Sequence, residues 1–104
     1  MRYHAGAMSS EVHVVARFLA RAGRGGDLAA VLGALVAPTR DEAGCHQYDL
    51  LLNPSDPRDF CFVERWADDA ALDRHLATGH VRTALERSAD LIEAPPDVRR
   101  YRVA

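Results

Sequence analysis

The fold is decided by the stretch CHQYDLLLNPSDPRDFCFVERW, residues 45–66 of a 104-residue chain. Two segments rich in apolar and aromatic residues, about 45–52 and 59–66, flank the turn-forming cluster Asn53-Pro54-Ser55-Asp56-Pro57. Apolar segments separated by such a cluster are typical of two paired strands. The stretch therefore predicts a β-hairpin.

Symmetric pairing about the turn gives the expected register of this hairpin, in which the numbers of opposite residues sum to about 110. Tyr48 is then opposite Phe62, and His46 is opposite Glu64. Even-numbered side chains share one face, which is mainly apolar near the turn. Its other end collects His46, Tyr48, Glu64 and Trp66.

The residues before the hairpin predict a strand and a helix. Residues 11–20 alternate apolar and polar side chains, which indicates a strand, and the glycine-rich run 22–26 indicates a turn. Asp27 is the expected N-cap of a helix that ends between Pro38 and Gly44, with Gly44 in a left-handed conformation. The apolar stripe of this helix consists of Leu28, Val31, Leu32, Leu35 and Val36.

The residues after the hairpin predict a broken helix and a last strand. Asp68 is a second N-cap candidate, Gly79 interrupts the helical pattern, and Pro95-Pro96 ends it before a strand at 98–103. The order of elements is βαββαβ, which predicts a ferredoxin-like α+β fold: an antiparallel sheet with helices on one face. Residues 1–10 show no periodicity, and we expect a loose tail there. The helix-free face of such a sheet needs a partner.

Composition excludes several classes of protein. Hydrophobic residues make up 48% and charged residues 27%, which is typical of a globular domain rather than a disordered chain. The formal net charge of −2 gives no electrostatic footprint for nucleic acid. No apolar stretch is long enough to span a bilayer, and the first residues lack the apolar run of a signal peptide, so we expect a cytoplasmic protein.

The two cysteines and the spacing of the histidines predict neither a disulfide nor a metal site. Cys45 and Cys61 lie on the same face of the expected hairpin but not opposite each other, and a cytosolic chain keeps thiols reduced. No Cys-x-x-Cys or His-x-x-x-His spacing occurs. No Ser or Cys is flanked by a plausible base, so the sequence gives little support to covalent catalysis.

His75 is the sharpest candidate for chemistry. It interrupts the apolar stripe of its helix between Leu72 and Leu76, so we expect it to point toward the sheet. His80 follows the Gly79 break and can approach the same cavity. A base is one interpretation of His75, and a hydrogen-bonded core histidine is the other.

Three further residues have two readings each. Trp66 is either a pocket wall or the largest filler of the core. His46 and Glu64 form either an orienting pair beside the base or an exposed cross-strand pair.

Several segments resemble one family, the antibiotic biosynthesis monooxygenase domains. Residues 41–48, DEAGCHQY, resemble the family's Glu-x-Gly-Cys-x-x-Tyr segment. Residues 62–66, FVERW, followed by ALDRHL at 71–76 and by Gly79-His80, resemble its Glu-x-Trp and His-Leu…His segments. The resemblance covers nearly the whole of the expected domain, residues 11–104.

The resemblance implies both an assembly and an activity. Members of the family are homodimeric α+β barrels, in which two ferredoxin-like sheets pack face to face. They bind small aromatic substrates and oxidise phenols, hydroquinones or anthrones to quinones with O2, without a metal or flavin. By this resemblance His75 is the base, His80 or Tyr48 holds the substrate oxygens and Trp66 forms a wall, with His46, Glu64 and Phe62 as further substrate contacts.

Other activities in the same family stay open. An isomerase would use His75 to move a proton without consuming oxygen, and a ligand-binding or stress-response dimer would use the histidines only to line a cavity. The heme-degrading branch uses an Asn, a Trp and a His at positions where this chain has Ala16, His75 and Leu85. These three differences argue against heme degradation.

Overall fold

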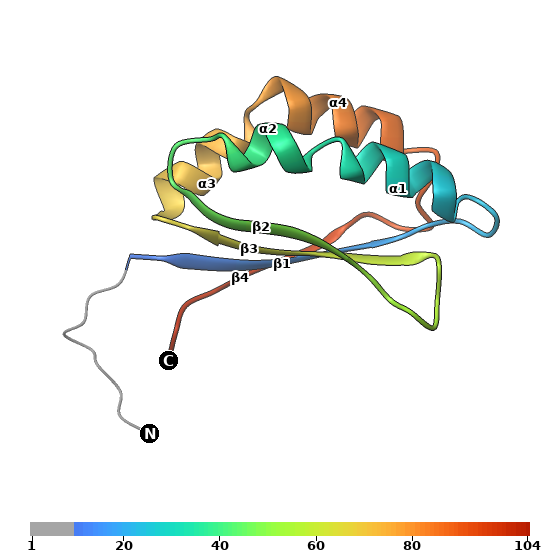
Figure 1. Ribbon diagram of the computed structural model, residues 1–104, viewed down its shortest axis with the longest axis horizontal. Helices are drawn as coiled ribbons and strands as arrows, with labels where there is room; N and C mark the ends of the chain where they lie inside the picture. Colours follow the sequence, from blue (N-terminus) through green and yellow to red (C-terminus); the bar gives the residue numbers. More distant parts are fainter. Residues whose placement is uncertain (1–9) are drawn as a thin grey trace.

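The computed structural model describes residues 10–104 as one sheet covered by helices on one face (Figure 1). The strands are β1 (Val12–Leu19), β2 (Cys45–Leu52), β3 (Asp59–Trp66) and β4 (Asp97–Tyr101). The helices are α1 (Gly25–Gly33), α2 (Val36–Arg40), α3 (Asp69–Leu76) and α4 (Gly79–Ser88). The predicted βαββαβ plan is confirmed. Apart from Ser10, whose hydroxyl donates to the carbonyl of Ala67, the predicted tail lies outside the described residues.

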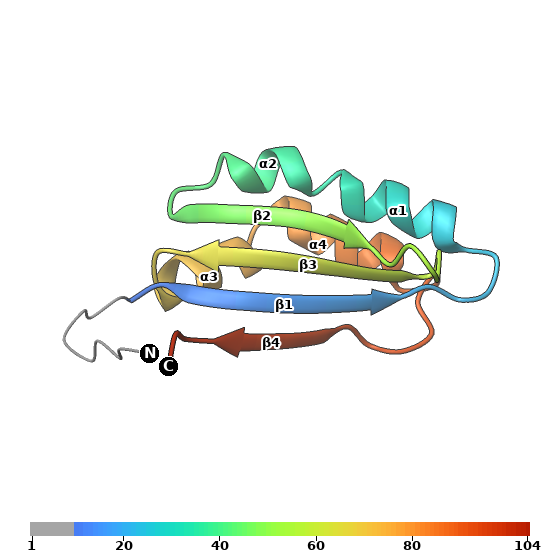
Figure 2. The ribbon, with the colours of Figure 1, turned by 60° about the horizontal axis from the view of Figure 1, so that its bottom comes forward.

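The sheet is antiparallel with strand order β2-β3-β1-β4, as the face-on view in Figure 2 shows. The two central strands, β1 and β3, alternate buried and more exposed side chains along their length. Their buried residues point to the helices, so one face of the sheet forms the core and the other carries no helix. None of the helices in residues 10–104 has the length and apolar character needed to cross a membrane.

The hairpin forms between the predicted strands, but its expected register is wrong by two residues. Tyr48 pairs with Glu64 and Leu50 with Phe62, so the numbers of opposite residues sum to 112. The cause lies in the turn, where the side chain of Asn53 accepts from the amide of Ser55 and that of Asp56 accepts from the amide of Arg58. These two side-chain caps centre the turn on Asp56. Because the shift is an even number, the even-numbered side chains still share one face.

The predicted pairing of His46 with Glu64 is also wrong. The register between β2 and β3 is irregular between Cys45 and Gln47, so His46 has no partner position in the ladder. Both cysteines are free thiols, as expected.

The helical segment before the hairpin differs from the expected single helix. One helix ends at Gly33 and a second begins at Val36. Pro38 lies in the first turn of α2, where a missing amide hydrogen is tolerated. Asp27 is not the N-cap, which is Arg24. It lies in the first turn of α1, where its carboxylate accepts from Nε of Arg24 at 2.8 Å and favours the helix N-terminus.

The second predicted cap is confirmed. Asp68 precedes α3, and its side chain accepts from the amide of Ala71 at 2.8 Å. The core between the sheet and the helices contains three close aromatic side chains from the hairpin. Tyr48 stacks on Phe62 with ring centroids 4.8 Å apart and meets Trp66 edge-on at 6.5 Å.

Candidate functional site

A cavity of about 120 Å³ lies between the inner face of the sheet and helices α3 and α4. Its wall is almost entirely apolar, and the described residues contribute three polar side chains to it: Tyr48, Glu64 and His75. A mostly apolar pocket with a few polar groups is typical of a small-molecule site. The other lining residues are Val14, Ala16, Phe18, Leu32, Leu35, Phe62, Leu72, Leu76, Val81, Ala84, Leu85, Pro96 and Val98.

The mouth of the cavity is an apolar rim. Leu76, Leu85 and Val98 line the cavity and are each about half exposed. Exposed leucine and valine side chains around an opening let an apolar ring approach without desolvating charged groups.

His75 is held against the aromatic side of this cavity. It lies in the last turn of α3 on the same side as buried Leu72, and it is only 3% exposed. Its ring lies 4.6 Å from the Trp66 ring and 5.5 Å from the Tyr48 ring, centroid to centroid. Burial lowers the pKa of His75, although the nearby Glu42 carboxylate opposes that shift. The imidazole is therefore favoured in its neutral form, which a base requires.

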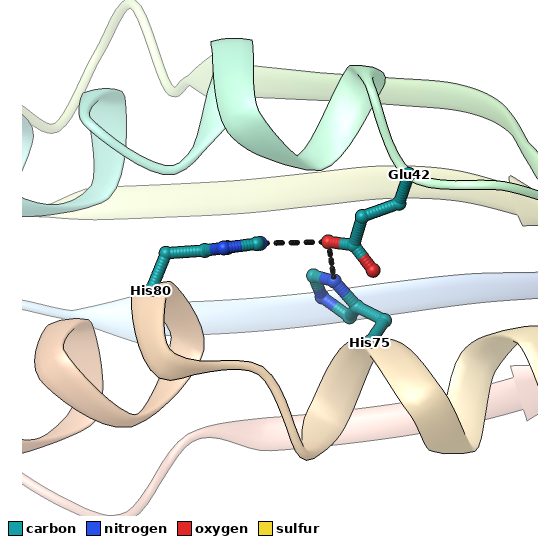
Figure 3. A group of neighbouring side chains, drawn as sticks. All are labelled: Glu42, His75 and His80. Carbon is teal, nitrogen blue, oxygen red and sulfur yellow. Dashed lines mark hydrogen bonds and ion pairs between the residues drawn. The ribbon is translucent and has the colours of Figure 1, made fainter.

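Glu42 joins His75 to the second histidine (Figure 3). Its Oε2 lies 2.8 Å from Nδ1 of His75 and 2.7 Å from Nε2 of His80. With Nδ1 donating to the carboxylate, Nε2 of His75 is the nitrogen left to accept a proton, and no residue in 10–104 bonds to it. A carboxylate that fixes the tautomer of a histidine is a common arrangement around catalytic bases.

Gly44 explains how Glu42 reaches this position. Its φ is +83°, as the sequence predicted, and a Cβ placed on it would be 2.7 Å from Cβ of Ala71. The loop after α2 therefore packs directly on α3. No role for Glu42 was predicted from the sequence, because 33 residues separate it from His75 and no local spacing links the two. Its place in the Glu-x-Gly-Cys segment was the one signal.

His80 does not line the cavity. It lies in the first turn of α4, whose N-cap is Thr78, and its side chain is 28% exposed. It faces a second hollow of about 380 Å³, lined also by Ala30, Val31, Ala34, Leu35, Thr83, Ala84 and Arg87. Glu42 therefore connects a buried imidazole at the cavity to a partly exposed one.

Glu64 contributes a buried carboxyl group to the cavity. It is 4% exposed, and its Oε1 accepts from the indole Nε1 of Trp66 at 2.8 Å. Burial raises the pKa of Glu64 to about 7, so the carboxyl group is about half protonated at neutral pH and largely protonated below it. Burial also raises the pKa of the Tyr48 hydroxyl. Interaction with the Thr39 side chain opposes that rise. The residues that line the cavity thus include a hydroxyl and a carboxyl group that can each be a hydrogen-bond donor.

The other predicted substrate contacts differ in position. Phe62 lines the cavity beside Tyr48. Trp66 is fully buried and is not part of the lining; it packs behind His75 and bonds to Glu64. His46 is exposed, away from the cavity, with Nδ1 2.7 Å from Oε2 of Glu11.

Comparison with protein families gives one match that spans most of the chain. Residues 11–87 match the family described as "Antibiotic biosynthesis monooxygenase". The "Putative monooxygenase Rv0793" of Mycobacterium tuberculosis is 35% identical over 88 residues, which are 85% of this chain and 86% of that protein. An uncharacterized Synechocystis protein is 33% identical over 69 residues, and the match spans 47% of its length.

Solved structures share the same fold. The crystal structure of PA3566 from Pseudomonas aeruginosa has a TM-score of 0.86 at 39% identity, covering 93% of this chain and 98% of that one. The structure of Rv0793 has a TM-score of 0.85 at 32% identity, covering 91% of this chain and 96% of that one.

Proposed function

The chain belongs to the antibiotic biosynthesis monooxygenase family, and we propose that it oxidises a small phenol or hydroquinone with O2 to a quinone, without a bound cofactor. One observation carries the proposal: the imidazole of His75, favoured in its neutral form, lines an apolar cavity, and Glu42 holds its Nδ1, which leaves Nε2 to accept a proton. These are the features of a general base for an aromatic hydroxyl group.

The chemistry begins with deprotonation. His75 removes the phenol proton, and the electron-rich phenolate transfers an electron to O2; the two radicals combine at a ring carbon to give a peroxide. Loss of the hydrogen on that carbon then breaks the O–O bond. One oxygen atom stays on the ring as the second carbonyl, and the other leaves as water with the two hydrogens that the phenol has lost.

Two other groups position the substrate in this proposal. The Tyr48 hydroxyl and the protonated Glu64 carboxyl donate hydrogen bonds to the oxygens of substrate and peroxide, since both line the cavity. Donors aimed at an oxygen that gains negative charge stabilise it more than they stabilise the neutral phenol. His80 acts through Glu42 rather than on the substrate.

The size of the cavity favours one aromatic ring. A volume of about 120 Å³ is near that of the engineered apolar cavities, about 150 Å³, that bind benzene. A tricyclic anthrone would extend beyond the rim of Leu76, Leu85 and Val98, so we rank single-ring phenols and hydroquinones first.

Oxygen uptake by metal-free protein with a panel of phenols, hydroquinones and anthrones tests the proposal. We expect uptake above the spontaneous rate, and a decrease in kcat of about 10²–10⁴-fold in His75→Ala, the range attributed to general acid–base catalysis. His46→Ala is the matched control, because this imidazole also contacts a glutamate but lies away from the cavity. Uptake that does not exceed the spontaneous rate on any substrate would exclude the monooxygenase.

Isomerisation of a small keto compound is the second candidate. The observation in its favour is that a neutral base, His75, and a protonated acid, Glu64, line the same cavity, which is what moving a proton between two carbons requires. Consumption of substrate with no consumption of oxygen would identify this reaction. Tight binding of a ligand without turnover would instead identify a binding protein.

A further inference from the structure

The cluster of Glu42, His75 and His80 contains three side chains that commonly bind transition metals. One ligand atom from each side chain lies within 4.8 Å of the other two. They come from three elements: the loop after α2, the end of α3 and the start of α4 (Figure 3). Two histidines and one carboxylate form the ligand set of several zinc enzymes, with water as the fourth ligand.

We propose that Glu42, His75 and His80 form a binding site for one divalent transition metal ion, Zn²⁺ being the reference ion, and that the bound ion takes His75 out of use as a base. The second part rests on the proposed function; the first part does not.

The distances fit this proposal with small movements. Ligand atoms on a tetrahedral Zn²⁺ are about 3.4 Å apart for bonds of about 2.0–2.1 Å. The two nitrogen–oxygen contacts at 2.8 and 2.7 Å therefore need to lengthen by about 0.6–0.7 Å. We expect His80 to make most of this movement, because its side chain is 28% exposed, against 13% for Glu42.

Burial and access also fit. The Glu42 carboxylate supplies one negative charge in a site of low exposure, where its attraction for a cation is weakly screened. The hollow beside His80 gives an ion and a fourth, water ligand a route from solvent. The backbone of His75 is fixed in turn, since the hydroxyl of Thr78 donates to its carbonyl at 2.7 Å.

The effect on the base follows from the tautomer of His75. Without metal, its proton is on Nδ1 and donates to Glu42, and Nε2 accepts the phenol proton. A metal ion needs the lone pair of Nδ1, so the proton of the neutral ring moves to Nε2. An imidazole protonated on Nε2 cannot accept a proton from a substrate in the cavity. The metal-bound protein is therefore expected to be inactive.

Calorimetric titration of the chelator-treated full chain with Zn²⁺ tests the binding site. We expect saturation at one equivalent and a rise in Tm with Zn²⁺ that a chelator reverses, because the ion binds the folded state. Glu42→Gln and His80→Gln should each weaken binding by at least the roughly 10–100-fold that changes around a metal's ligands cause. Cobalt(II) should give the intense visible bands of a four-coordinate site in the wild type but not in these variants.

The controls separate this site from adventitious binding. His46→Gln removes the other short imidazole–carboxylate contact, at 2.7 Å, and should leave affinity and stoichiometry unchanged. Two results would overturn the proposed metal site. One is that the wild type shows no saturable binding of Zn²⁺; the other is that His46→Gln abolishes binding whereas Glu42→Gln does not. The Tm measurement identifies a variant that fails to fold.

Oxygen uptake tests the second part separately. Added Zn²⁺ should abolish the uptake that the metal-free protein shows, and a chelator should restore it. Zn²⁺ bound at the cluster with uptake unchanged overturns the inhibitory role. If no phenol is oxidised by metal-free protein, the proposed function fails while the binding data still decide the metal site.

Discussion

At the scale of single residues, the candidate site contains a carboxyl group in an apolar environment. Glu64 is buried among aromatic and aliphatic side chains, and within residues 10–104 its hydrogen-bond donor is the indole of Trp66. The energetic consequence is a preference for the neutral acid in the folded state. That preference makes Glu64 both a hydrogen-bond donor in the cavity and a source of pH-dependent stability.

Replacing Glu64 by Gln should remove this pH dependence. The pKa of Glu64 is raised to about 7 in the folded protein, above the ordinary glutamate value of 4.5, so its favourable contribution to stability is fully present below pH 4.5 and is lost as the pH rises through 7. At pH 8 the variant should therefore be more stable than the wild type by up to about 3 kcal/mol, and at pH 4.5 the two should be similar. Urea denaturation at both pH values measures the difference. Glu86→Gln, on the exposed face of α4, is the control. A Glu64→Gln variant that is no more stable than the wild type at pH 8 would contradict the raised pKa of Glu64.

From the sequence, the direction in which His75 points could be predicted, but the hydrogen-bond partners of His75 and Glu64 could not. The interrupted stripe of α3 correctly indicated that His75 points inward, because that argument uses only the helical repeat. The partner of His75, Glu42, is brought to it by a loop whose path depends on Gly44 and Ala71 in contact, which no local pattern encodes. For the same reason the sequence paired Glu64 with His46 rather than with Trp66.

At the scale of elements, strand and helix positions followed from periodicity, whereas register and breaks followed from side-chain contacts. The strands of the hairpin have the predicted bounds, but Asn53 and Asp56 cap the turn and move its centre by one residue. The split between α1 and α2 was likewise not visible in the continuous stripe of Leu28 to Val36. Both errors arise because turn chemistry can override a symmetrical or periodic pattern.

The loop that carries Glu42 gives a prediction at this scale. Gly44→Ala should lower the free energy of unfolding by about 1–3 kcal/mol, because alanine is strained at φ +83° and its Cβ would meet that of Ala71. It should also displace Glu42 and reduce activity. Gly33→Ala is the matched control: nothing lies within 4 Å of a Cβ there, and alanine in a helix stabilises by about 0.4–1 kcal/mol. Equal stability of the two variants, measured by chemical denaturation, would contradict the role of Gly44.

At the scale of the whole molecule, the sheet has one face without helices. The strand order and the βαββαβ connection explain this, since both helical segments cross the same face (Figure 1). The uncovered face carries apolar side chains among charged ones: Val15 pairs with Val63 in β3 and with Arg99 in β4, and Leu51 pairs with Cys61 on the same side. Val15, Leu51 and Tyr101 are more than one-third exposed. A domain of this size buries only a modest core, so leaving such an apolar surface exposed to water is a large loss relative to its stability.

We therefore expect a homodimer in which two such faces pack together, as the resemblance to dimeric barrels implies. Sedimentation at micromolar concentration should show a dimer for the wild type. Val15→Asp should shift it toward monomer, because burying a carboxylate between two packed sheets costs desolvation energy that its neighbour Arg99 on β4 offsets only in part. Ala70→Asp places the same charge on the exposed side of α3 and should leave the dimer intact. Circular dichroism separates dissociation from unfolding, and a wild-type chain that stays a stable monomer would contradict the face-to-face arrangement.

If Val15→Asp is a folded monomer, its oxygen uptake further shows whether the cavity, which lies on the opposite side of the sheet, works within one chain.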